Sequence, residues 1–320
     1  MGWRSTLRSL EAASRRAAKE AERQRKQEAR EQMVAEASDA VEAWQEHIDD
    51  LVSVHTDLAE AVNWERIAAL PRPEEPTAIT EEGDRARAAL DSFKPRVFDP
   101  LIGGSERRRR RLEASLDAAV ERDRARSAER LAEYKEALAE WEEDTTLAKN
   151  LLLGEPEAVR TVIQEKQSFT ENGLIGKEIQ FSIGGGYVHA KPEVHDDEIV
   201  PRFRRKQLAS GRLSETKMPI SQRNELYQDY VSSISLKVAG DLFNIIPMDS
   251  IYVTCFTRML NNSTGHIEST PILSVKFVRQ TIVSLNLDAI DPSEALRNFN
   301  HVMSFKKTKG FARIEPLEPA

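Results

Sequence analysis

Cysteine is almost absent from this sequence, since Cys255 is the single one among 320 residues. An internal disulfide needs two cysteines and a cysteine-rich zinc site needs several, so both are excluded. Cys255 lies within the run from Ile251 to Phe256, whose apolar character is typical of a strand. We therefore predict that Cys255 is a small buried residue and not a nucleophile.

Long apolar runs are missing as well. No stretch approaches the ~18 to 20 apolar residues that a membrane-spanning helix needs, and the start of the chain lacks the apolar core of a secretory signal. Aromatic residues make up 6% and charged residues 31%, with a net charge of -7. This balance is typical of long solvated helices, and any nucleic-acid role would depend on a local basic patch. We expect a cytoplasmic protein of a bacterium.

Two stretches carry an apolar repeat with alternating steps of three and four residues. The first covers residues 34–62 and is interrupted only by His55, and the second covers residues 131–152. Such a repeat predicts a helix seam that is covered by a partner helix. A proline-rich connection at 63–79 separates the two seams. We predict an antiparallel coiled-coil hairpin, with pairing between two chains in a homodimer as the alternative.

The chain begins with a small amphipathic cluster of Trp3, Leu7 and Leu10, which share one helical stripe beside two arginines. It would dock on an acidic membrane surface or a partner, or else fold back on the protein. Residues 5–33 then consist mainly of strong helix formers without an apolar face, so we predict a solvated helix that continues to about Val62.

Five consecutive arginines, residues 107–111, form the densest charge in the chain. They lie near the start of a helix predicted from Ser105 to about Leu153, where cations oppose the helix dipole. The run is either a phosphate contact or a solvated face. A shorter helix is predicted over 80–93, although Gly83 weakens that prediction.

The composition changes after Gly154. We predict a helical coiled-coil region over 1–153 and an α+β domain over 155–320, with helices on one face of a mainly antiparallel sheet. The predicted strands are 179–183, 187–191, 251–260, 272–278 and 311–314, and the predicted helices are 156–167, 201–210, 219–246 and 291–303. Residues 184–186 are three glycines between two strands, which predicts a turn. A phosphate loop would be followed by a helix.

Two basic clusters stand out in the α+β domain. They comprise Arg204, Arg205 and Lys206, on the helix predicted over 201–210, and Lys306, Lys307 and Lys309 near the end of the chain. If both clusters lie on one side of the sheet, they form a positive surface for a phosphate-rich partner such as nucleic acid. Otherwise they are two solvated patches.

A metal site is the next hypothesis, because His189, His195 and Asp197 lie close together in the sequence with further acids beside them. Imidazole and carboxylate are common ligands, but no H-E-x-x-H spacing is present. Nuclease chemistry of the restriction type needs an acid and then Glu-x-Lys on neighbouring strands. Asp249 and Lys276 supply part of this pattern, whereas the acid two residues before Lys276 is missing.

No convergent catalytic set emerges from the sequence. We therefore expect a non-enzymatic scaffold or interaction protein that uses a coiled-coil arm and an α+β binding domain, without a cofactor. The expected partner is a protein. One alternative is a divalent-metal nuclease or phosphoesterase, and a second is a coiled-coil protein attached to the membrane surface.

Overall fold

The computed structural model describes residues 3–94, 104–166, 173–176, 179–184, 186–261 and 263–319, with side chains from Lys19 onward and for Arg16. The chain divides into two compact units, one of residues 1–62 together with 154–320 and one of residues 63–153. The N-terminal helix thus belongs to the same unit as the C-terminal sheet, whereas we predicted one helical region over residues 1–153.

The first unit is built on a six-stranded sheet. Its strands, in spatial order, are β1 (Ile179–Gly184), β2 (Tyr187–Pro192), β5 (Ser250–Leu260), β6 (Ile267–Val278), β7 (Asn300–Lys306) and β8 (Gly310–Ala312). Among the described strands of this sheet, β2 and β5 are the one parallel pair, and the other neighbours are antiparallel. The prediction of a mixed fold with a mainly antiparallel sheet is confirmed.

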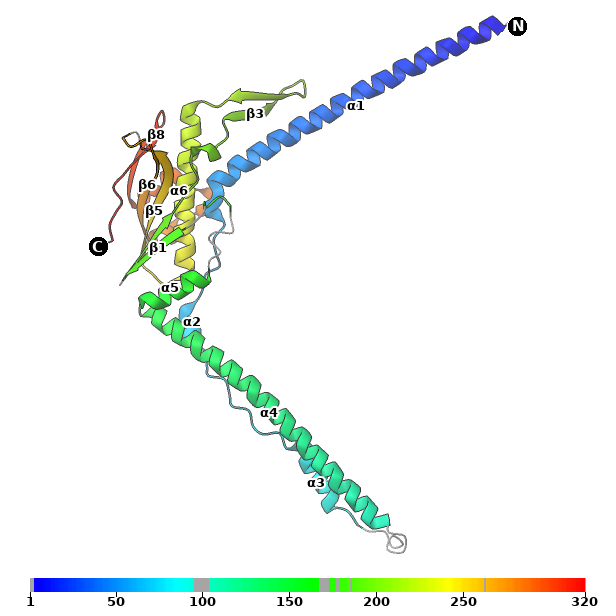
Figure 1. The fold of residues 1–320 in the computed structure, drawn as a ribbon, viewed down its shortest axis with the longest axis vertical. Coiled ribbons are helices and arrows are strands. Elements are labelled where there is room, and N and C mark those ends of the chain that lie inside the picture. The colour runs from blue at the N-terminus through cyan, green and yellow to red at the C-terminus, as the bar shows by residue number, and fades with distance from the viewer. Residues whose placement is uncertain are drawn as a thin grey trace. The chain divides into compact units, whose positions relative to one another are not determined.

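Helix α6 (Ile220–Ile245) is the centre of this unit and connects β2 to β5. Every residue from Tyr230 to Phe243 is buried, so the helix is covered on all sides. Strands β5, β6 and β8 pack on one side of it, and α1 (Trp3–Ser53), the 3-10 turn Val54–Thr56 and α8 (Pro292–Ala295) also contact it (Figure 1). Cys255 on β5 is fully buried as predicted, with its sulfur 3.9 Å from the carbonyl oxygen of Val231.

The apolar seam over 34–62 packs on α6. The helical part ends at Ser53, and the chain then follows α6 as an extended strap, so the predicted continuation to Val62 is wrong. His55, the one interruption of the seam, lies 2.8 Å from Ser233 Oγ through Nδ1 and 3.0 Å from the Leu287 carbonyl oxygen through Nε2. A partner within the same unit therefore accounts for this seam, and a coiled coil is not shown.

The helix predicted over 201–210 is wrong, because these residues form a hairpin of β3 (Phe203–Gln207) and β4 (Leu213–Lys217). Gly211 has a φ of 82°, which few other residues adopt, and it makes the turn possible. The Gln207 side chain donates to the carbonyl oxygen of Val34 at 2.8 Å, which fixes the hairpin to α1. Tertiary contacts and the glycine turn thus outweigh the helical appearance of the sequence.

The helix predicted over 291–303 is also wrong beyond its first turn. Its start is as predicted, since Asp291 Oδ1 accepts from the Glu294 N–H at 2.9 Å. However, α8 gives way to a 3-10 turn, Leu296–Asn298, and the chain enters β7 at Asn300. The backbone of this segment instead forms its hydrogen bonds by pairing of β7 with β6. The remaining helices of the unit are α5 (Pro156–Glu165) and α7 (Arg279–Ser284), with 3-10 turns Asp197–Ile199 and Leu287–Ala289.

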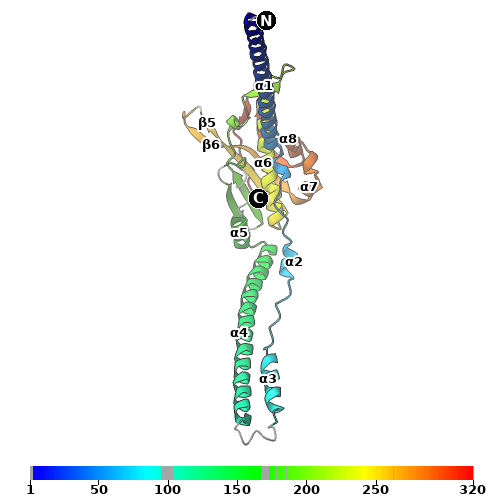
Figure 2. The ribbon, with the colours of Figure 1, turned by 90° about the vertical axis from the view of Figure 1, so that its right-hand side faces the viewer.

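The second unit consists of α2 (Trp64–Ala68), α3 (Glu81–Asp91) and α4 (Gly104–Leu152), with α2 and α3 packed along α4 (Figure 2). Helix α4 is held to the connecting segment by polar contacts: Trp141 Nε1 donates to the Leu70 carbonyl oxygen at 2.9 Å, and the Ile79 N–H donates to Ser127 Oγ at 2.9 Å. None of the described helices is long and apolar enough to cross a membrane.

Candidate functional site

A cavity of about 380 Å³ opens at the N-terminal end of α6. Four parts of the first unit line it: residues 196–197 after β2, Asn224 and Tyr227 of α6, residues 257–260 of β5, and residues 309–311 at the β7–β8 turn. The cavity therefore lies where the crossover helix, the longest hairpin and the end of the sheet meet.

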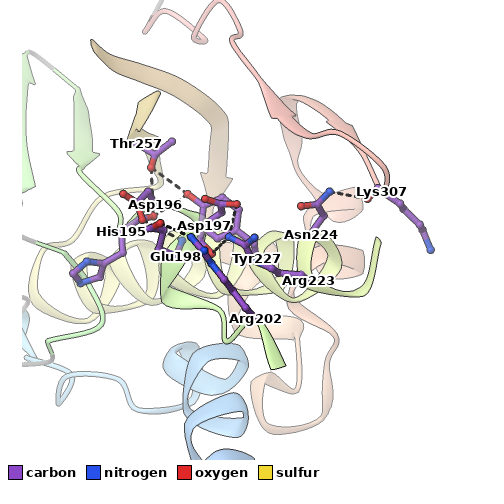
Figure 3. Close-up of polar contacts among 10 residues, drawn as sticks. All are labelled: His195, Asp196, Asp197, Glu198, Arg202, Arg223, Asn224, Tyr227, Thr257 and Lys307. Carbon is purple, nitrogen blue, oxygen red and sulfur yellow. Dashed lines mark hydrogen bonds and ion pairs between the residues drawn. The ribbon is translucent and has the colours of Figure 1, made fainter. Parts of the chain in front are cut away.

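Tyr227 forms a rigid base for this cavity. Its hydroxyl donates to the carbonyl oxygen of His195 at 2.8 Å and lies 3.1 Å from Thr257 Oγ1 (Figure 3). The ring of Phe311 packs edge-on against it, with centroids 5.6 Å apart. Burial raises the pKa of the Tyr227 hydroxyl far above its ordinary value. Tyr227 is therefore neutral at physiological pH, and its hydroxyl is engaged as a hydrogen-bond donor to His195.

The acidic loop beside the cavity is held by internal bonds. The guanidinium of Arg223 donates to Asp197 Oδ2 at 2.6 Å and to the Asp197 carbonyl oxygen at 2.8 Å. Asp196 Oδ1 accepts from the Glu198 N–H at 3.1 Å, and Arg202 pairs with Glu198 at 2.7 Å (Figure 3). These contacts give the carboxylates a structural role in shaping the loop.

Two cations on the cavity wall, Arg258 and Lys309, make no ion pair with the residues that the structure describes. Lys307, two residues before Lys309, is by contrast paired with Glu225, and its carbonyl oxygen accepts from Asn224 Nδ2 at 2.7 Å. With Asp197 neutralised by its arginine, the charges left on the wall are these two cations and Asp196. The cavity thus has an excess of positive charge.

Arg258 also lines a second cavity of about 190 Å³. Gly176 and residues 193–196 form the rest of its wall. The two cavities therefore share Arg258 and Asp196 and lie along the same stretch of β5.

The three predicted metal ligands are not brought together. His189 is buried, with Nε2 2.8 Å from Thr254 Oγ1, while His195 Nε2 lies 2.9 Å from the Gly173 carbonyl oxygen and Asp197 is bound by Arg223. Burial, and secondarily Lys191, lowers the pKa of His189 to about 4. Within the described parts of the chain, no group of three or more His, Cys, Asp or Glu residues is placed to hold a metal ion.

The two predicted basic clusters lie on separate hairpins. Arg204, Arg205 and Lys206 belong to β3, whereas Lys306, Lys307 and Lys309 belong to the β7–β8 hairpin on the other side of α6 (Figure 1). Arg205 is bound to Glu215 across the β3–β4 hairpin at 2.9 Å. Of the six predicted residues, Lys309 is the one that lines the larger cavity. A nucleic-acid surface made from both clusters stays a prediction, and this separation weighs against it.

Among the described residues, the partial nuclease pattern is not completed by a group of carboxylates that could hold a metal ion. The ammonium of Lys276 lies over the ring of Tyr252, 5.4 Å from its centroid. Glu268 is eight residues away on the same strand, about 26 Å at the usual rise. It accepts hydrogen bonds from Asn261 and Thr264, which lower its pKa. Asp249 precedes β5, and its carbonyl oxygen accepts from the Arg279 N–H.

Two further predicted contacts can be located only in part. Helix α1 begins at Trp3, but the side chains of Trp3, Leu7 and Leu10 lie outside those that the structure describes. The arginines at 107–111 are all exposed on α4, and Arg109 is bound to Glu113 at 3.1 Å.

No protein-family model matches the chain, and no curated protein or solved structure is detectably similar to it. Sequence reasoning did not single out Asn224, Tyr227, Thr257 or Arg258 as site residues. The available signal was Arg258, a cation near the end of an otherwise apolar predicted strand. The other three depend on the crossover of α6 over the sheet.

Proposed function

We propose that this protein is a non-enzymatic interaction protein whose α+β unit binds a protein partner. The observation that carries the proposal is the cavity at the N-terminal end of α6. Its tyrosine and one of its two carboxylates are bound internally. Two cations that have no ion pair among the described residues, and the apolar side chains of Met259 and Leu260, remain on its wall. Such a combination suits recognition, since the cations and the apolar surface attract a partner.

Helix α1 supports the same proposal. Residues 19–32 are exposed throughout, and intrahelical contacts such as Lys26 with Glu22 at 2.6 Å and Gln27 with Glu31 at 3.0 Å stabilise this stretch. A helix that is polar on all sides adds little to a core. It offers a long accessible surface, as expected for an arm of a scaffold protein.

The proposal is tested by photo-cross-linking in cells that make the protein. A benzophenone amino acid would replace Lys306 near the cavity, Lys26 on α1 or Glu140 on α4, each exposed. We expect a discrete covalent adduct with another protein from at least one position, identified by mass spectrometry. Two results would contradict the proposal: no protein adduct from any position, or Mg²⁺-dependent cleavage of plasmid DNA by the purified chain.

A further inference from the structure

Strand β5 extends beyond its neighbour on one side. Its pairing with β2 ends at Val253, and the last backbone hydrogen bond on that side runs from the Val194 N–H to the Phe256 carbonyl oxygen at 2.8 Å. The strand itself continues to Leu260, paired with β6 on its other side. No described residue pairs with residues 258–260 on this side, so within the described structure they present an open strand edge.

The direction of the backbone groups on this edge follows from the register. Asn261 donates its N–H to the His266 carbonyl oxygen at 2.8 Å, and Leu260 lies opposite Ile267. Backbone groups of successive strand residues point alternately to the two sides. Odd-numbered residues near the turn thus bond to β6, and the N–H and C=O groups of Arg258 and Leu260 point to the open edge. Phe256 is also even-numbered, and its carbonyl oxygen, which accepts from the Val194 N–H, points to the same side.

Both cavities border this edge. The larger one is lined by residues 257–260 and the smaller one by Arg258. Side chains of a strand alternate between its two faces. The cavities therefore leave room for the side chains of a segment that pairs with the edge. If other residues were packed closely against the edge, this room would be absent.

The charge and exposure of the edge indicate the kind of segment that fits. Arg258 and Lys309 give the larger cavity its excess positive charge. Of the two carboxylates on that wall, Asp197 is paired with Arg223, and Asp196 has no ion pair with a described residue. Leu260 is 59% exposed and offers apolar surface at the end of the edge. An acidic side chain next to apolar ones complements these groups.

We propose that the partner binds by strand addition: an extended, acidic segment pairs with the open edge of β5 at Arg258 and Leu260 and places a carboxylate between Arg258 and Lys309. This inference rests on the proposed function, because it names the site and the chemistry of the protein partner. Main-chain hydrogen bonds supply affinity, and the two cations supply the preference for acidic residues.

The experiment uses a displayed library of random decapeptides, selected on the full-length chain. We expect the selected peptides to contain Asp or Glu flanked by β-branched or aromatic residues. Their binding, measured by fluorescence anisotropy, should weaken at least tenfold in Leu260→Pro, which removes an edge donor but no bond to β6. Ile267→Pro is the matched control, because it removes the equivalent N–H on the opposite side of the same hairpin. Equal binding to both proline variants would overturn the proposal.

Charge and backbone protection give two independent readouts. The double variant Arg258→Glu, Lys309→Glu should lose the acidic peptides and bind the same peptides with lysine in place of the acid. In the unsubstituted protein, bound peptide should slow hydrogen exchange at the Arg258 and Leu260 amides. This second measurement holds even if a proline variant fails to fold. Failure to select any peptide, or exchange unchanged at both amides, would overturn strand addition.

Failure of this inference can be told apart from failure of the proposed function. If photo-cross-linking captures a protein whose adduct is undiminished in Leu260→Pro, the edge is not its site and the interaction role stands. If no protein is captured at any position, both proposals fall.

Discussion

The carboxylate of Asp123 on α4 accepts a hydrogen bond from the backbone N–H of Gly83 at 2.7 Å, across 40 residues of sequence. Gly83 lies in the first turn of α3, where N–H groups have no partner within the helix. Asp123 is only 4% exposed, so α4 caps α3 from outside. A Cβ at position 83 would lie 3.2 Å from Val120 Cγ2, which is tighter than an ordinary contact, so a larger residue would require the Val120 side chain to shift.

The first prediction concerns this cap. Asp123→Ala should leave the Gly83 N–H buried without an acceptor, at a cost of about 1 to 3 kcal/mol in the local free energy of unfolding. Hydrogen exchange over residues 81–91 should become faster by a corresponding factor. Asp117→Ala, an exposed aspartate on the same helix, is the control and should leave the exchange unchanged. Equal exchange in both variants would mean that the cap does not stabilise α3.

The second prediction concerns the buried ion pair of Lys237 and Asp241 on α6, whose charged atoms lie 3.2 Å apart. Asp241 Oδ1 also accepts from the Ala59 N–H at 2.7 Å, and Lys237 donates to the Asp57 carbonyl oxygen, so the pair fastens the strap after α1. Burial is the main influence on Asp241 and raises its pKa, while Ala59 and Lys237 oppose that shift.

Removing one member, by Lys237→Met or Asp241→Leu, should cost about 3 to 5 kcal/mol in stability because the other charge stays buried without a partner. The double variant should cost clearly less than the sum of the two single variants. Urea unfolding of all four proteins measures this coupling. Strictly additive costs would show that the two charges do not stabilise each other.

Helix α6 and the β3–β4 hairpin illustrate how much of this fold could be predicted from the sequence. The periodic apolar residues of α6 predicted its bounds to within one residue, because burial against a sheet imposes a helical pattern on sequence. Residues 203–217 carry mostly polar side chains and depend on Gly211 and the contact with Val34. Gly211 is visible in the sequence, but the contact with Val34 joins residues far apart in the chain, so no local apolar pattern predicted the hairpin.

The seam over 34–62 shows the same limit for a contact between distant residues. Its heptad spacing predicted a covering helix in a coiled coil, but a coiled coil is not shown, and the spacing does not identify the partner. The covering helix is α6, nearly two hundred residues later in the chain. The candidate cavity was hidden for the same reason, because Tyr227, Arg258 and Lys309 meet only through the topology of the sheet.

The third prediction concerns pH and the buried histidine His189. Its pKa is lowered to about 4 from 6.5, first by burial, so the folded state disfavours the charged form. The unfolded state binds the proton more tightly, and stability is therefore lost as pH falls from 6.5 toward 4. His55, buried against Ser233 and Leu287, has a lowered pKa for the same main reason and acts in the same direction.

The measurement is the melting temperature between pH 4.5 and 7.5. His189→Gln keeps a polar group near Thr254 but cannot take up the proton, so its melting temperature should fall less on acidification than that of the unsubstituted protein. His266→Gln, at an exposed position in the β5–β6 turn, is the control. Identical pH profiles for all three proteins would show that the lowered pKa of His189 does not reduce stability on acidification.

The last prediction concerns Asp229 on α6, where the pH effect has the opposite sign. Burial raises the pKa of Asp229 to about 6 from 3.8, and the nearby carboxylates of Asp291, Glu225 and Glu294 act in the same direction against a hydrogen bond from Ser293. The folded state thus binds the proton more tightly than the unfolded state does. The stability gained from protonated Asp229 is complete below about pH 3.8 and is lost as pH rises through 6.

Asp229→Asn mimics the neutral carboxyl at every pH. We expect the variant to be more stable than the unsubstituted protein at pH 7.5, with the difference shrinking as pH falls toward 4. Asp39→Asn, an exposed aspartate on α1, is the matched control. Thermal unfolding at several pH values measures both differences. A gain in stability that is the same at pH 4.5 and 7.5 would point to a packing effect of the amide, and a loss at pH 7.5 would mean that the Asp229 carboxylate is stabilised where it lies.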